Sequence, residues 1–293
     1  MQNVIQYAVD SISYGSLFAL MALSLALLFS VMGLMNFAYG ELIMVGGYTM
    51  YTLRDESWLL VIPTVIVIVT IVSILQERIA FRPLRHASPI TLLVASFGVS
   101  YGLQKIAEMS VGPIPKGVPP SPWLVQSFDV WGINVSRLDI ITFVSTIVLL
   151  IATTLVLNRT MLGVQLRAST EDFDMARLVG VRANRVIVAA FAITGLLAGV
   201  VALCYVSRNG SVSPTMGSGP LLVAFVGGVI GGLGSLTGAT LGGFLLGATT
   251  TALQATLPTD LSSYTELFAF SAVIAILVLR PRGLFARREV RVA

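Results

Sequence analysis

The chain is poor in charged residues, in cysteine and in histidine. Only 11% of its 293 residues are charged, against roughly a quarter in an ordinary soluble domain, and 56% are hydrophobic. A soluble globule cannot bury that much apolar surface. The single cysteine, Cys204, excludes a disulfide framework and a cysteine metal cluster. The single histidine, His86, has no carboxylate or cysteine near it in sequence, so neither a metal site nor a catalytic base is predicted there.

Three further absences narrow the class of protein. The first basic residue is Arg54, so the start of the chain lacks the basic region of a signal peptide, and the first apolar segment is predicted to be a retained span. The glycine-rich run from Gly227 lacks the Gly-Lys-Ser/Thr ending of a phosphate loop, so no ATP site is predicted. No Ser-His-Asp set or pair of intramembrane acids can be assembled, which disfavours an intramembrane enzyme.

The charged residues are separated by long uncharged stretches. No charge lies between Asp10 and Glu41, and the longest gap, residues 209–259, holds 51 uncharged residues. A transmembrane helix needs about 20 apolar residues. These gaps predict an all-α, polytopic integral membrane protein with a single transmembrane domain over residues 1–293. The nine predicted helices, with eight as the alternative, lie near residues 11–32, 36–53, 57–76, 87–104, 140–158, 186–207, 219–233, 238–257 and 263–279. The weak one is 219–233, which its glycines could make a re-entrant half-helix.

The basic residues predict the orientation. With nine crossings and the N-terminus outside, thirteen of the eighteen basic residues face the cytoplasm, as the positive-inside rule expects. They are Arg78, Arg82, Arg85, Arg159, Arg167, Arg177, Arg182, Arg185, Arg280, Arg282, Arg287, Arg288 and Arg291. The net charge of +4 is explained by this distribution, so no nucleic-acid partner is predicted.

Two polar connections are long enough to act outside the bilayer. The outer one, about residues 105–139, is rich in proline and is predicted to be an ordered cap or short hairpin. The inner one, about residues 159–185, is predicted to hold a short cytoplasmic helix. The predicted cap and first-turn acids are Ser169, Thr170, Glu171 and Asp172. The predicted apolar contacts are Phe173, Ala176, Leu178 and Val179, and Gly180 is predicted to end the helix.

Glycines spaced four apart recur in the last third of the chain. Pairs drawn from Gly227, Gly231, Gly234, Gly238 and Gly242 give smooth helix faces that allow close packing in lipid. The alternative interpretation is a gate whose helices slide past each other, because no side chains interlock on these faces.

Glu41 falls inside a predicted span, where a carboxylate is costly and marks a functional site. The alternative is that Glu41 sits in the first turns of its helix, stabilised by the helix dipole, with Asn36 as the N-cap. Both interpretations remain open from the sequence.

Four segments resemble the branched-chain amino acid permeases of ABC importers, the LivH type. They are 33–41 (GLMNFAYGE) with 46–48 (GGY), 167–181, 231–239 (GGLGSLTGA) and 280–285 (RPRGLF). Tyr39 departs from the usual histidine of the first segment. Of the importer pattern Glu-Ala-Ala-x3-Gly, only Ala176 and Gly180 match strictly.

The resemblance implies a multi-pass permease of a bacterial inner membrane, which moves branched-chain or other hydrophobic amino acids by alternating access. It also implies partners: a second, homologous permease subunit in a heterodimer, a periplasmic solute-binding protein and two cytoplasmic ATPases that bind ATP and Mg. The residues at 171–180 then form the coupling segment to the ATPases, and the span with Asn36, Tyr39, Glu41 and Tyr48 lines the solute path. Urea or short amides are alternative solutes, and a stand-alone channel or secondary transporter is the rival class.

Overall fold

The computed structural model describes residues 2–33, 36–84, 87–130, 133–171, 175, 178, 181–232, 235–257, 261 and 264–279. Each of the nine predicted spans contains one helix. The six long ones are α1 (Gln2–Met32), α3 (Trp58–Gln76), α4 (Pro89–Val111), α6 (Arg137–Arg159), α9 (Ala183–Asn209) and α11 (Leu236–Thr256). The three shorter ones are α2 (Tyr39–Thr52), α10 (Ser218–Gly231) and α13 (Thr265–Leu279).

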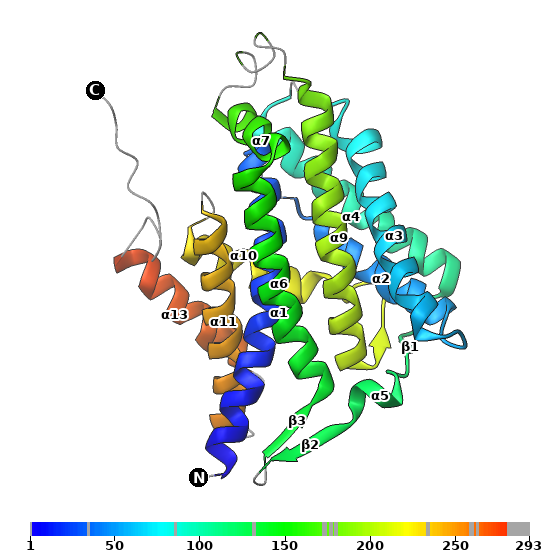
Figure 1. Cartoon of the computed structure of the whole chain (residues 1–293), viewed down its shortest axis with the longest axis vertical. Helices are drawn as coiled ribbons and strands as arrows, with labels where there is room; N and C mark the ends of the chain where they lie inside the picture. Colours follow the sequence, from blue (N-terminus) through cyan, green and yellow to red (C-terminus); the bar gives the residue numbers. More distant parts are fainter. Residues whose placement is uncertain are drawn as a thin grey trace.

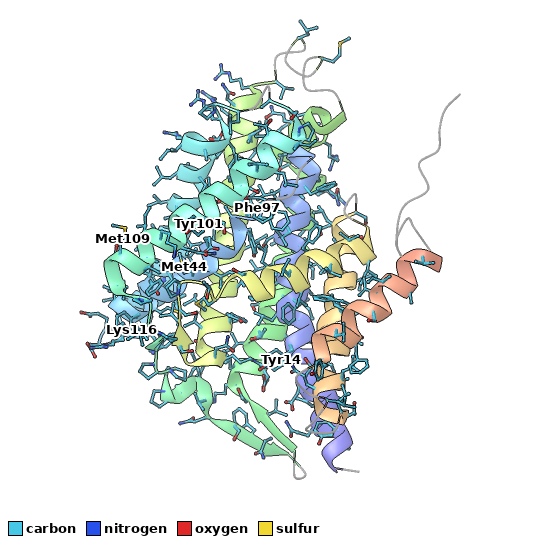
Figure 2. All side chains as sticks on the ribbon, turned by 180° about the vertical axis from the view of Figure 1, so that it is seen from behind. Tyr14, Met44, Phe97, Tyr101, Met109 and Lys116 are labelled. Atoms are coloured by element: carbon cyan, nitrogen blue, oxygen red, sulfur yellow. The ribbon has the colours of Figure 1, made fainter. Side chains whose placement is uncertain are left out.

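Six of these helices are long and apolar enough to cross a membrane, and they establish the predicted all-α membrane fold within the described residues. The other three differ. With 14 residues each, α2 and α10 are about 21 Å long, which is less than the roughly 30 Å of the hydrocarbon core. Nine complete crossings therefore remain a prediction. In Figure 1 the long helices run along the molecule, and Figure 2 shows the yellow α10 lying obliquely across its middle.

The two predicted polar connections lie at opposite ends of the molecule (Figure 1). At one end are the short helix α5 (Pro122–Val125) and the strands β1 (Lys116–Gly117), β2 (Ser127–Val130), β3 (Ile133–Ser136) and β4 (Ser211–Val212). The β2–β3 pair is the predicted hairpin, with Phe128 opposite Val135, while β1 pairs with β4 across the chain. At the other end lie α7 (Met161–Glu171) and the π-helical turn η1 (Glu77–Phe81) that continues α3.

Helix α1 forms the centre of the bundle. In its most apolar stretch 78% of the residues are buried, against 22%, 17% and 22% in α3, α4 and α6, which are therefore peripheral. Close contact with α11 depends on glycines: a Cβ added to Gly15 would lie 2.9 Å from the carbonyl oxygen of Phe244, and one added to Gly247 would lie 2.7 Å from the Phe18 ring. Small residues thus let the two helix backbones approach, as expected in lipid.

Several helix starts are fixed by serine side chains. Ser57, Ser88, Ser136 and Ser235 each accept a hydrogen bond from a backbone N–H of the first turn. At α6 the capping box is complete, because Asp139 also accepts from the backbone N–H of Ser136 at 3.1 Å. These caps satisfy donors that the membrane cannot hydrate.

Three predicted boundaries are wrong. Helix α4 continues to Val111, so the outer connection starts after that residue and not near Lys105. Ser169 and Thr170 lie within α7, which continues to Glu171, and the Ser169 hydroxyl donates to the Gln165 carbonyl. The third boundary concerns Asn36, which precedes α2 without being its N-cap; Ala38 holds that position.

Candidate functional site

The chain reaches the start of α2 through a short non-helical segment that is buried in the molecule. Asn36 is 3% exposed, and its Oδ1 accepts a hydrogen bond from the backbone N–H of Ala38 at 2.9 Å. The side-chain amide of Gln76, on α3, donates to the Ala38 carbonyl at 3.3 Å. Non-helical backbone in a membrane protein needs such internal partners. The segment is therefore held in place by side-chain amides.

The start of α10 lies directly against the start of α2. A Cβ added to Gly40 would be 2.7 Å from the carbonyl oxygen of Gly217, the residue before α10. Gly47, farther along α2, comes equally close to Val212 of β4. The segment from β4 to α10 therefore runs along α2 toward its buried end. Two helix N-termini, each with a partial positive charge, thus meet inside the molecule.

Glu41 lies in the first turn of α2 and is 1% exposed. Its Oε1 accepts two hydrogen bonds from α4, from the Ser100 hydroxyl at 2.8 Å and from the Gln104 amide at 2.7 Å. Its Oε2 has no hydrogen-bond partner among the described residues. One oxygen of the carboxylate is thus fixed, and the other is buried without a hydrogen-bond partner in the described part of the chain.

The same face of α4 carries a third polar contact. The hydroxyl of Ser96 accepts from the backbone N–H of Phe37 at 3.3 Å. Ser96, Ser100 and Gln104 are spaced four apart, so they form one stripe that faces α2. Because apolar packing alone gives little preference for a neighbouring helix over lipid, this stripe is the main directional contact that holds the peripheral α4 against α2.

A cavity of about 380 Å³ lies between α2, α3 and α4, toward the end that carries the strands. Its α2 wall includes Met44, Val45, Tyr48 and Thr52. Ile68 of α3 and Leu103, Ile106 and Ala107 of α4 supply much of the remaining apolar lining. Figure 2 shows Met44 next to α4, along which Phe97, Tyr101 and Met109 are labelled. The volume falls in the range of about 300–1,000 Å³ that small-molecule sites have.

The structure separates the four predicted path residues. Glu41 lies behind the cavity and Tyr48 lines it, and the Tyr48 hydroxyl has no partner among the described residues. Tyr39 is fully buried in the main hydrophobic cluster, and Asn36 lies in the segment before α2. Sequence reasoning missed Ser100 and Gln104; the four-residue spacing of polar side chains in an otherwise apolar span could have indicated them.

Only two residues of the predicted coupling set, Glu171 and Leu178, fall in the described part of the chain. Asp172, Phe173, Ala176 and Gly180 lie outside the described residues, and Glu171 is the last residue of α7. Leu178 is 80% exposed.

The predicted packing glycines lie where α10 and α11 meet. A Cβ added to Gly227 would be 2.6 Å from the Cα of Gly243, while one on Gly231 would clash with the backbone of Gly238. Gly242 faces Gly227 and Gly231 in the same way, whereas Gly234 lies outside the described residues.

No group of three or more His, Cys, Asp or Glu side chains that could hold a metal is found among the described residues. His86 lies outside them. The candidate site is therefore a buried polar cluster beside an apolar cavity, without metal-binding chemistry in the part of the chain that is described.

Comparison with known proteins matches residues 7–279 to the family described as branched-chain amino acid transport system, permease component. The chain is 32% identical to the high-affinity branched-chain amino acid transport system permease protein BraD of Pseudomonas aeruginosa, over 98% of this chain and 97% of the relative. It is 29% identical to LivH of Salmonella typhimurium, over 98% and 96%. It is 28% identical to the probable LivH of Methanocaldococcus jannaschii, over 94% and 90%. No solved structure matches the chain significantly.

Proposed function

The chain belongs to the family of branched-chain amino acid transport permease components, and from that premise we propose that it carries branched-chain amino acids across the bacterial inner membrane as one subunit of an ATP-driven importer. Two ATPase subunits that bind ATP and Mg supply the energy, and a solute-binding protein delivers the amino acid. A second, homologous permease subunit completes the path as a heterodimer.

The observation that carries this proposal is the buried carboxylate of Glu41 beside the cavity between α2, α3 and α4. An ionisable group inside a membrane bundle is costly and is retained where a solute or ion must pass. The short helices α2 and α10 begin next to it, an arrangement that transporters use to expose backbone groups to a solute. Asn36, in the non-helical segment before α2, and Tyr39, the first residue of α2, are proposed to line the path when the helices rearrange.

The orientation follows from the basic residues. The α7 end carries Arg159, Arg167 and Arg182 and is proposed to be cytoplasmic, with the strand end and the N-terminus periplasmic. The solute-binding protein then docks on the hairpin β2–β3, and the ATPases dock near α7. ATP-driven closure of the ATPases moves the segment after α7 and alternately exposes the path to each side.

An uptake assay in liposomes tests this function. The complete importer should accumulate leucine only when ATP is inside and the binding protein is outside. If the purified chain alone moves leucine, it is a stand-alone transporter. If urea or a short amide competes fully with leucine for uptake while valine does not, the amino-acid assignment is wrong.

Leu178 tests the proposed contact with the ATPases. We expect Leu178→Asp to lower uptake at least about tenfold while ATP hydrolysis persists, because a charge on an exposed apolar side chain weakens a helix-in-groove contact. Uptake and hydrolysis are measured on the same liposomes. Ile114→Asp is the matched control, since Ile114 is 69% exposed at the strand end. Equal uptake in both variants would remove Leu178 from the coupling contact.

A further inference from the structure

We propose that the cavity between α2, α3 and α4 binds a solute through its ammonium group, with the free oxygen of Glu41 as the acceptor and Tyr48 as the donor to the solute carboxylate. This inference rests on the proposed function and specifies the chemical class of solute that the site takes: a zwitterionic amino acid with an aliphatic side chain, in preference to urea or a neutral amide.

The first step is that Glu41 shares a helix face with the cavity. Met44, Val45, Tyr48 and Thr52 line the cavity from α2, and they follow Glu41 by three, four, seven and eleven residues. Side chains at these spacings lie on one face of an α-helix. Glu41 is thus the next side chain inward on this helix face, about one turn, or roughly 5 Å, from Met44 and Val45.

The α4 wall continues inward to the same point. Leu103 and Ala107 line the cavity, and Ser100 precedes them by three and seven residues on the same face. Ser100 and Gln104 both donate to the Oε1 of Glu41. The carboxylate and the two α4 donors that fix it therefore lie just inward of the cavity, behind the residues that line it.

The hydrogen bonds of Glu41 select the kind of group it can bind. Two neutral donors satisfy Oε1, and Oε2 has no partner among the described residues. No basic side chain forms an ion pair with Glu41 there. A carboxylate oxygen only accepts hydrogen bonds, and a charged donor makes a shorter and stronger bond to it than a neutral one. An ammonium group supplies both the charge and the donor, whereas urea and amides supply only a neutral N–H.

The rest of the cavity fits the other two parts of an amino acid. Met44, Ile68, Leu103 and Ile106 present an apolar surface to an aliphatic side chain. Tyr48 lines the cavity, and its hydroxyl is buried without a partner among the described residues. Side chains on a helix lean toward its N-terminus, so the hydroxyl is directed toward the turn between Tyr48 and Glu41. One acceptor and one donor then lie along the same wall.

Protection of a cysteine in the cavity tests this proposal. The complete importer in nanodiscs carries Ala107→Cys in a Cys204→Ser background, and the rate of alkylation by N-ethylmaleimide is measured. Leucine should slow alkylation, and so should isopentylamine, which keeps the ammonium group but lacks the carboxylate. 4-Methylpentanoate, which is leucine without its amino group, should not. Glu41→Gln should raise the half-protective leucine concentration about tenfold or more, because one charge-assisted hydrogen bond is lost.

Two matched variants separate binding from structure. Ser100→Ala removes one hydrogen bond from the same carboxylate but keeps its charge, so leucine protection should change less than about threefold. Tyr48→Phe should remove the advantage of leucine over isopentylamine and leave isopentylamine protection intact. Glutamine at position 41 can still accept the α4 hydrogen bonds, so loss of protection in that variant is not explained by a displaced α4.

Three results would overturn the inference. They are equal leucine protection with and without the Glu41 charge, protection by 4-methylpentanoate as strong as that by leucine, and an Ala107→Cys importer that still takes up leucine but gains no protection from it. In the last case the cavity holds a lipid chain or is empty, and leucine does not bind there. Failure of the wild-type importer to take up leucine at all would instead refute the proposed function, so the two failures are distinguishable.

Discussion

Gly242→Val is expected to prevent stable packing of α11 against α10. A Cβ on Gly242 would lie 2.5 Å from the backbone nitrogen of Gly231 and closer still to the Gly227 carbonyl oxygen. These obstacles are backbone atoms, which cannot rotate away as a side chain can. Overpacking a well-packed site costs about 1–3 kcal/mol even where side chains can adjust. We expect a loss of at least about 3 kcal/mol, with little folded protein recovered.

The single cysteine provides the measurement. Cys204 is 5% exposed on α9, so a thiol-reactive dye labels it only as the protein unfolds. The labelling midpoint on heating should fall by roughly 6 °C or more in Gly242→Val.

Gly102→Val is the matched control for this substitution. Gly102 lies in the middle of the long helix α4, and a Cβ there would meet nothing within 4 Å. The same added atoms should therefore change stability by less than about 1 kcal/mol. Equal midpoints for the two variants would show that close α10–α11 packing does not stabilise the chain.

The sequence predicted the positions of the helices better than the residues at which they begin and end. Uncharged stretches predict where the six long apolar helices lie, because a membrane span must exclude charge over about 20 residues. The ends depend on hydrogen bonds that the pattern does not contain. Asn36 has the residue type of an N-cap, yet its side chain supports a buried turn before α2. Ser169 and Thr170 also have cap chemistry, but α7 continues through them.

The candidate site shows the same limit. Glu41 stands out in the sequence because it interrupts an apolar segment, and the structure buries it. Its partners Ser100 and Gln104 lie about sixty residues later, and only the packing of α4 against α2 brings them together. Glu41 lies in the first turn of α2, as one of the two interpretations expects, and its functional role stays a prediction. Position in a helix does not exclude a functional role.

Arg208→Met is expected to cost about 3 kcal/mol or more at the strand end of the molecule. Arg208, in the last turn of α9, forms an ion pair with Asp139 of α6, and both side chains are largely buried, at 13% and 14% exposure. The hydroxyl of Ser13, on α1, donates to Asp139 at 2.7 Å, so the pair joins three helices. Removing one partner of a buried pair leaves an uncompensated charge, which typically costs 3–5 kcal/mol. Asp139 keeps its other hydrogen bonds, so we expect the loss of stability to lie near the lower end of this range.

The double variant Arg208→Met/Asp139→Asn separates the charge from the contacts. Asparagine can still accept the hydrogen bond from the Ser136 backbone N–H, and no unpaired charge remains, so stability should return to within about 1–2 kcal/mol of wild type. Lys105→Met is the control for an exposed pair: Lys105 and Glu108 are 2.6 Å apart with 45% and 27% exposed side chains, and this change should cost less than about 1 kcal/mol. The stability of each variant is measured as the midpoint of Cys204 labelling on heating. A double variant less stable than Arg208→Met would show that the hydrogen bonds of the Asp139 carboxylate from Ser13 and the Ser136 N–H outweigh the cost of burying its charge without Arg208.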